Sequence, residues 1–322
     1  MATIQTIAGP RDTADLGQTL THEHLISGFG GMHRAGLFDL DEAVRRTTAA
    51  LQQAYEVGIR SIVDCTPVDL GRTIELFQRV ADATPINVVA ATGVYRNIPT
   101  AYAPWDPDTY AEYFLRDIQQ GIEGTSIRAG VIKIAWDLET QIEPMLVLLE
   151  KAARGAARAS KAGGVPITCH TRSVDHHGDR LIEIFEEEGL DLRAVTIGHV
   201  NDSREMDYLL RMAKKGVTLG LDRFNPRGGD EELARRSQVA VDLINAGFQE
   251  QMSLGHDLAG YSINGGPPTG GPRPEFAGVW RLVSEVELPY LRAHGVTDDQ
   301  IDAVMARSTR ATFEAAAAMA AH

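Results

Sequence analysis

Histidines and one aspartate recur in this 322-residue chain at places where short apolar runs end. The earliest pair, His22 and His24, stands in "GQTLTHEHL" with Glu23 between them. If this run is a strand, residues two apart point to the same side, so both imidazoles face inward while Glu23 faces the helices. Glu23 is therefore expected to be a structural or supporting group. Later apolar runs carry Lys133, His170, His199 and Asp257.

These residue types indicate a metal site. Neutral imidazole and carboxylate are the usual ligands of zinc and its first-row neighbours, and a catalytic site leaves one position open for water. Four histidines and one aspartate are more than one tetrahedral ion can use, so we expect two ions. A single buried histidine is more often a packed core residue, but four that converge on one place favour metal binding.

Lys133 needs a separate explanation, because an ammonium group has no lone pair to offer a metal. Beside cations and away from water its pKa is expected to fall, which frees the amine for covalent chemistry. Three outcomes are open: a carbamate formed with carbon dioxide, a Schiff base as in barrel aldolases, or a buried ion pair. The surrounding candidate ligands favour the carbamate, N6-carboxylysine, whose two oxygens can bridge two metals.

Eight strands would bring these residues together. Short β-branched runs alternate with longer stretches of helical periodicity, which is typical of a parallel (β/α)8 TIM barrel with its site at the carboxyl ends of the strands. A doubly wound sheet is the alternative, but no glycine-rich phosphate turn follows the first run. The predicted strands are 17–24, 61–66, 87–95, 129–137, 165–171, 194–200, 216–222 and 251–257, and the predicted helices are 41–57, 69–83, 107–121, 140–162, 175–189, 202–215, 230–247, 275–294 and 298–318.

The chain shows no linker, so we expect one hydrolase domain over residues 1–322. Asp69, Asp202 and Asp230 are predicted to cap the helices that they precede. The stretch "NGGPPTGGPRP", 264–274, follows the eighth strand and is either a lid or specificity loop or a surface excursion.

Composition excludes several kinds of partner. With 31 basic and 44 acidic residues the net charge is -13, which favours neither nucleic acid nor an anionic membrane surface. No apolar run approaches the roughly 20 residues of a membrane span, and the N-terminus does not resemble a signal peptide, so a cytoplasmic protein is expected. Cys65 and Cys169 lie in apolar runs and are expected to be buried free thiols.

The segments "THEHL", "VIKIAWD", "VPITCHT", "VTIGHVND", "GLDRF" and "LGHD", in this order and spacing, resemble the phosphotriesterase family of the amidohydrolase superfamily. They are most similar to its phosphotriesterase-like lactonases, over about residues 10 to 315. The resemblance implies that His22, His24 and Asp257 bind the more buried ion. It implies that His170 and His199 bind the more exposed one.

The same resemblance implies that carboxylated Lys133 and a hydroxide bridge the two ions. The metals of the family are typically zinc, cobalt, manganese or iron, of which zinc is expected here. Asp257 would also serve as general base, accepting the proton of the attacking hydroxide. A homodimer is a further family expectation.

Three more positions match the lactonase branch. Arg223 and Asp202 correspond to residues that lead the proton away from the metal-binding aspartate, and a rim salt bridge is the structural alternative. Tyr95 corresponds to a tyrosine that hydrogen-bonds the lactone or the bridging water, and a half-buried barrel tyrosine is the alternative. Trp136, where relatives have a small residue, would narrow the pocket or give it an aromatic wall. The loop 258–275 also departs from the acyl-chain-binding relatives.

We therefore expect a binuclear metal-dependent hydrolase that opens lactone rings by attack of the bridging hydroxide. Acyl-homoserine lactones, the substrates of quorum quenching, and γ- or δ-lactones are the expected substrates, with weak promiscuous activity on phosphotriesters. A dedicated phosphotriesterase or carboxylesterase is the alternative. A Schiff-base lyase that uses Lys133, or a metal-binding protein without catalysis, explains less easily why Asp257, Asp202 and Arg223 occur together.

Overall fold

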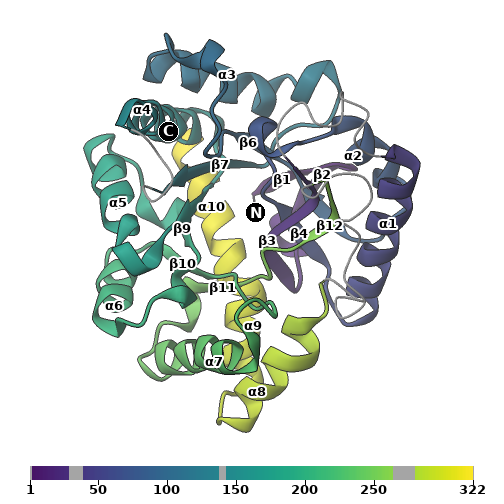
Figure 1. Cartoon of the computed structure of the whole chain (residues 1–322), viewed down its shortest axis with the longest axis vertical. Coiled ribbons are helices and arrows are strands. Elements are labelled where there is room, and N and C mark those ends of the chain that lie inside the picture. Colours follow the sequence, from purple (N-terminus) through teal and green to yellow (C-terminus); the bar gives the residue numbers. More distant parts are fainter. Residues whose placement is uncertain (1, 29–38, 138–142, 264–279, 322) are drawn as a thin grey trace.

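In the computed structural model, parallel strands form a barrel inside a ring of helices (Figure 1), and the predicted (β/α)8 barrel is confirmed. The structure describes residues 2–28, 39–137, 143–263 and 280–321. One sheet has the order β11-β10-β9-β8-β7-β6 and the other has the order β12-β3-β4-β5. The strands are β3 (Thr19–Ser27), β4 (Ser61–Asp64), β5 (Asn87–Val89), β6 (Ala91–Gly93), β7 (Val131–Trp136), β8 (Ile167–Thr171), β9 (Val195–Gly198), β10 (Thr218–Leu221), β11 (Met252–Leu254) and β12 (Ala259–Ser262).

The two sheets join at two places, between β5 and β6 and between β11 and β3, and these junctions close the barrel. The predicted third strand is interrupted at Ala90, so that β5 pairs with β4 and β6 pairs with β7. On the opposite side, the Thr21 hydroxyl donates to Ser253 Oγ at 2.9 Å and the Asp257 N–H donates to the His22 carbonyl at 3.1 Å. The start and the end of the barrel sequence therefore lie side by side.

The helices pack one apolar face against the barrel. α1, for example, buries Ala43, Leu51 and Ala54 and begins at Asp39, whose carboxylate accepts the Glu42 N–H at 3.1 Å. α10 crosses the amino ends of the strands. The helices are α1 (Leu40–Glu56), α2 (Ile74–Ala81), α3 (Pro107–Gln119), α4 (Glu143–Gly163), α5 (His177–Glu187), α6 (Met206–Lys214), α7 (Gly229–Asn245), α8 (Leu288–Ala293), α9 (Asp298–Asp302) and α10 (Ser308–Ala320).

Some elements differ from the prediction. An antiparallel hairpin, β1 (Thr3–Thr6) with β2 (Gly9–Asp12), precedes the barrel, and β12 adds a parallel strand beside β3. π-helical stretches, Val283–Glu287 and Ala303–Arg307, occur in the last two predicted helices. The segment 264–274, most of the loop 258–275 and the start of the helix predicted at 275 lie outside the described residues. Within the described ranges, no helix is long and apolar enough to span a membrane.

The three predicted aspartate caps are wrong. Asp69 is buried, and its carboxylate accepts the N–H groups of Tyr95 and Asn97 at 2.7 and 3.0 Å instead of capping α2. Asp202 ends a short 3-10 helix before α6, and Asp230 lies inside the first turn of α7. For Asp69 and Asp202, the loop between strand and helix is longer than the sequence pattern indicated, since α2 and α6 begin at Ile74 and Met206. For Asp230, the helix begins one residue earlier than predicted, so Asp230 lies inside it.

Glu287, in the first π-helical stretch, predicts a pH dependence of stability. Its side chain is 1% exposed, Oε2 accepts the Ser237 hydroxyl at 2.5 Å, and Oε1 has no hydrogen-bond partner among the described residues. Burial raises the pKa of this carboxyl from 4.5 to about 7. The folded state thus holds a proton that the unfolded state has lost, so stability falls as pH rises through this window, by about 3 kcal/mol in total.

Urea unfolding of the wild type and of Glu287→Gln between about pH 5 and about pH 8 checks this expectation. The variant should lose most of the decline in stability, because glutamine stays neutral. Glu285→Gln, on the same turn but exposed, is the control and should keep the wild-type slope. An unchanged slope in Glu287→Gln would contradict the assignment.

Candidate active site

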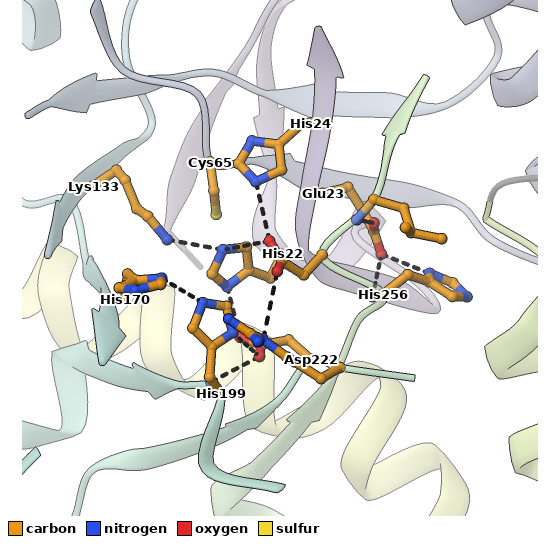
Figure 2. Close-up of polar contacts among 12 residues, drawn as sticks. His22, Glu23, His24, Cys65, Lys133, His170, His199, Asp222 and His256 are labelled. Atoms are coloured by element: carbon orange, nitrogen blue, oxygen red, sulfur yellow. Dashed lines mark hydrogen bonds and ion pairs between the residues drawn. The ribbon is translucent and has the colours of Figure 1, made fainter. Parts of the chain in front are cut away.

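Side chains from strands of both sheets point into one space at the carboxyl ends of the strands (Figure 2). His22 and His24 come from β3, Lys133 from β7 and His170 from β8, and His199 follows β9. Lys133 Nζ lies 2.8 Å from His22 Nε2, and His199 Nε2 lies 2.7 Å from His170 Nδ1. All five side chains are buried. The strand alternation read from the sequence therefore places both imidazoles of the first pair toward the interior.

Asp257, just after β11, joins this group from the end of the barrel sequence. Its Oδ1 lies 3.4 Å from His24 Nε2 and 3.9 Å from His22 Nε2. Ligand atoms of His22, His199 and Asp257 all lie within 4.8 Å of one another. This set of imidazoles and one carboxylate has the donor chemistry that suits zinc and its first-row neighbours.

Burial sets the protonation of these groups. It lowers the pKa of His170 to about 4, and it also lowers the pKa values of His22 and His199, the first with help from the Lys133 ammonium. Burial alone would raise the pKa of Asp257, but nearby positive and hydrogen-bonding groups outweigh it and keep that pKa well below its ordinary value. At neutral pH the imidazoles of His22, His170 and His199 are therefore neutral and the Asp257 carboxylate is charged, which are the forms that bind a metal.

Asp222, which was not predicted from the sequence, orients two of these imidazoles. Its Oδ2 lies 2.6 Å from His22 Nδ1, and its Oδ1 lies 2.7 Å from both the ring Nδ1 and the backbone N of His199. Burial raises the pKa of Asp222, but the two imidazoles outweigh it and hold the pKa below its ordinary value. An ionised carboxylate only accepts, so each Nδ1 carries the proton and each Nε2 is left with a free lone pair.

Two glycines make room for this carboxylate. A Cβ on Gly198 would lie 2.8 Å from Asp222 Oδ2, and a Cβ on Gly220 would lie 3.0 Å from the same atom. Both glycines precede a polar strand end, in "TIGH" and "TLGLD". Together with the acid that ends the seventh predicted strand, they are the sequence signal that could have revealed Asp222.

Thr66 and Asp137, which also support the imidazoles, were missed as well, whereas Glu23 was expected to be a supporting group. Thr66 Oγ1 lies 2.9 Å from His24 Nδ1, and Asp137 Oδ2 lies 3.3 Å from His170 Nε2. On the opposite face of β3, the Glu23 carboxylate accepts the backbone N–H of His256 at 2.8 Å and lies 2.7 Å from its ring Nδ1 (Figure 2). Glu23 thus points away from the imidazoles on its strand and fixes the chain beside Asp257.

Arg223 joins the central carboxylate to the rim. Its guanidinium lies 3.5 Å from Asp257 Oδ2 and 3.2 Å from Asp202 Oδ2, so the two aspartates are connected through one arginine. Asp202 also pairs with Arg236 of α7 at 2.8 Å, a contact that was not foreseen. Tyr95 Oη lies 3.3 Å from His170 Nδ1, and burial raises the pKa of this phenol, which keeps it protonated.

Trp136 does not point into the space occupied by the imidazoles. It is on β7 three residues after inward-pointing Lys133, so strand alternation turns it outward, and it lines a groove between α4 and α5. The expectation that Trp136 forms a wall of the substrate pocket is therefore wrong. His176 and His177 line the same groove, and both are separate from the imidazole cluster.

Two residues of the site have unusual backbone conformations. His199 has φ 63° and Asp257 has φ 53°, in the left-handed region that favours glycine and that, among other residues, asparagine, aspartate and histidine adopt most often. Each stands directly after its strand or a few residues beyond it, where the chain turns sharply and projects the side chain over the barrel. The conformation costs of the order of 1–3 kcal/mol per residue.

A (β/α)8 barrel with this set of imidazoles, carboxylates and one lysine at its strand ends defines a class, the metal-dependent barrel hydrolases. The sequence profile of the Phosphotriesterase family matches residues 2–313, and the chain belongs to that family. It is a hydrolase of the phosphotriesterase type, and enzymes of this family depend on two metal ions and act on small molecules.

Similar proteins cover almost the whole chain. An aryldialkylphosphatase of Saccharolobus solfataricus is 33% identical over 94% of this chain and 96% of its own length. A phosphotriesterase homology protein of Mycobacterium tuberculosis is 35% identical over 98% of both chains. A solved structure of the phosphotriesterase from Mycobacterium tuberculosis superposes with a TM-score of 0.85 at 32% identity, covering 97% of this chain and 98% of that one.

Proposed function

We propose that this hydrolase opens lactone rings, acyl-homoserine lactones or γ- and δ-lactones, with weak activity on phosphotriesters. In this proposal His22, His24 and Asp257 hold one divalent ion, and His170 and His199 hold the second. Zinc is the proposed metal because imidazole nitrogens dominate the set. When bound, the ions would supply a water that ionises near neutral pH and positive charge for the substrate oxygen.

Lys133 is proposed to carry a carbamate between the ions. The amine nitrogen forms a bond to the carbon of carbon dioxide and loses a proton, which leaves an anion with two ligand oxygens. The side chain is 1% exposed, and it makes no ion pair with any carboxylate of the described residues. A buried ammonium without a counterion is costly, which argues against the ion-pair alternative.

Asp257 is proposed to take the proton of the attacking water. Arg223 lies between Asp257 and Asp202, so it stabilises both carboxylates and connects the interior to the rim, where the proton can leave. The ring oxygen of the lactone, which becomes the leaving alkoxide, would lie beside Tyr95, whose neutral phenol can donate a hydrogen bond to it.

The observation that carries the choice of a lactone is the neutral Tyr95 phenol beside His170. Ring opening expels an aliphatic alkoxide, a strong base that needs a proton as it leaves. An aryl phosphotriester expels a phenolate, which leaves without one. A donor at this place therefore assists lactones more than aryl esters or aryl phosphotriesters. A dedicated phosphotriesterase or carboxylesterase is the alternative.

A hydrolysis panel of homoserine lactones, aliphatic lactones, aryl esters and paraoxon, run with metal-loaded wild type and Tyr95→Phe, tests the proposal. The wild type should turn over lactones with the highest kcat/KM. Tyr95→Phe should lose about tenfold or more on lactones and much less on paraoxon. If lactones are not the fastest class, the proposal fails and the alternative stands.

A Schiff-base lyase is distinguished by a separate measurement. Borohydride added with a carbonyl substrate would trap a covalent adduct on Lys133 in a lyase, whereas none is expected here. A metal-binding protein without catalysis would bind ions but turn over no compound of the panel.

A further inference from the structure

Arg227 lies at the mouth of the site and has no assigned role. It belongs to the loop after β10, its side chain is 59% exposed, and its Nη1 lies 3.5 Å from Asp257 Oδ2. Such a cation, directed at the centre of the site and open to solvent, is available to a ligand that enters.

The loop holds Arg227 in a fixed position. The Phe224 N–H donates to the Gly255 carbonyl at 3.2 Å, and Asn225 Nδ2 donates to the His256 carbonyl at 2.6 Å. Asn225 Oδ1 accepts the Arg227 N–H at 3.1 Å, and buried Arg236 donates to the Arg227 carbonyl at 3.0 Å. The backbone of Arg227 is thus anchored to the same chain segment that carries Asp257, so the loop itself needs little ordering when the side chain binds a ligand.

The charges around Arg227 leave it short of a counterion. Among the described residues its carboxylate partner is Asp257, which it shares with Arg223. The second carboxylate here, Asp202, is shared by Arg223 and Arg236. Arg236 has a further carboxylate, Glu232, at 3.8 Å, whereas the ion pairs of Arg223 and Arg227 go to the two aspartates. If Asp257 binds an ion, as proposed above, its charge is committed to that ion and Arg227 faces the site without a partner.

We infer that Arg227 selects substrates that carry a negatively charged group, a carboxylate in particular, beside the ester that is cleaved. This inference rests on the proposed function and narrows its substrate class to anionic lactones or esters. A guanidinium pairs with a carboxylate through two parallel hydrogen bonds, and such charge-assisted bonds are stronger than neutral ones. Arg227 is a specificity residue in this view and takes no part in the bond cleavage.

Matched substrates that differ only in charge test the inference. N-succinyl-homoserine lactone ends in a carboxylate, and N-succinamoyl-homoserine lactone ends in a neutral amide of nearly the same shape. The 4-nitrophenyl esters of succinic acid and succinamic acid form a second pair without a lactone ring. Metal-loaded wild type should prefer the anionic member of each pair by about tenfold in kcat/KM, mainly through KM, and added salt should reduce the preference.

Arg227→Gln should remove most of this preference, measured as the ratio of kcat/KM on the anionic and the neutral lactone, while leaving the metal content close to wild type. Calorimetry should show about tenfold weaker binding of the ring-opened product, N-succinyl-homoserine, to the same variant. Arg227→Lys should restore part of the preference. Arg204→Gln is the control, because Arg204 is a 76% exposed arginine of the neighbouring loop whose ion-pair partner is Glu232 at 3.7 Å.

The outcomes separate the two proposals. Equal rates on charged and neutral lactones, or an unchanged preference in Arg227→Gln, would overturn the role of Arg227 and leave the lactonase proposal intact. A preference for the anionic nitrophenyl ester that depends on Arg227, without turnover of either lactone, would uphold the inference and refute the lactonase. If Arg204→Gln lost the same preference for anionic substrates, the preference would come from the overall positive charge near the site, and this result would contradict the role of Arg227.

Discussion

The Lys133→Met variant should keep its fold and lose roughly a thousandfold in kcat/KM on every substrate that the wild type hydrolyses. Methionine fills nearly the same buried volume but has no amine to carboxylate, so the proposed bridge between the ions cannot form. Metal analysis after dialysis should find about one ion per chain instead of two, because the ligand that the two ions would share is missing.

The carbamate can also be observed directly. Wild type reconstituted with metal and ¹³C-bicarbonate should show a carbamate carbon resonance that is absent from Lys133→Met. Lys215→Met, at an exposed lysine that pairs with Glu186 on the outer ring, is the matched control and should retain metal and activity. Full activity in Lys133→Met would exclude the carbamate assignment.

The second large effect is expected from Asp222→Asn, at a residue that we do not propose as a ligand. An amide replaces one accepting oxygen by an NH2 group, which cannot accept a hydrogen bond from the imidazole facing it. That imidazole, of His22 or of His199, must then take the other tautomer, with its proton on Nε2. A protonated Nε2 has no lone pair for a metal, so metal affinity should fall by about 10- to 100-fold and activity with it.

Metal titration by calorimetry, together with the activity at saturating metal, measures this effect. The control is Asp117→Asn, because Asp117 is likewise buried but pairs with Arg72 and Thr92 in the outer layer. That variant should lose stability without losing metal affinity. If Asp222→Asn binds metal as tightly as wild type, the tautomer argument is wrong.

The sequence predicted well those features that recur with each strand and helix of the barrel. Strand and helix periodicity predicted the barrel, and the strand ends indicated His22, His24, Lys133, His170 and His199 as one group, which the structure brings together. This works because the carboxyl ends of all parallel strands in a barrel open onto the same face, so position along a strand is enough to predict proximity.

The residues that support this group could not be predicted in the same way. Asp222 contacts His22 across 200 residues of sequence, and that contact depends on the register between strands and on the space left by Gly198 and Gly220. The prediction for Trp136 was wrong for a simpler reason. Trp136 is three residues after Lys133 on the same strand, so the alternation of side chains already places it on the outer face of the barrel. The predicted caps at Asp69 and Asp202 were wrong because short 3-10 turns, which leave no periodicity in the sequence, follow β4 and β9. The predicted cap at Asp230 was wrong because α7 begins one residue earlier.

The left-handed backbone of His199 and Asp257 bears on how this protein can be engineered. Glycine or asparagine at either position would relax the backbone, but it would also remove a partner, since the His199 imidazole bonds buried Asp222 and the Asp257 carboxylate pairs with Arg223 and Arg227. Selection for heat resistance alone weighs these two effects on stability and gives no weight to the proposed roles of the imidazole and the carboxylate. Any stabilisation programme has to hold these two codons fixed, or score turnover in every round.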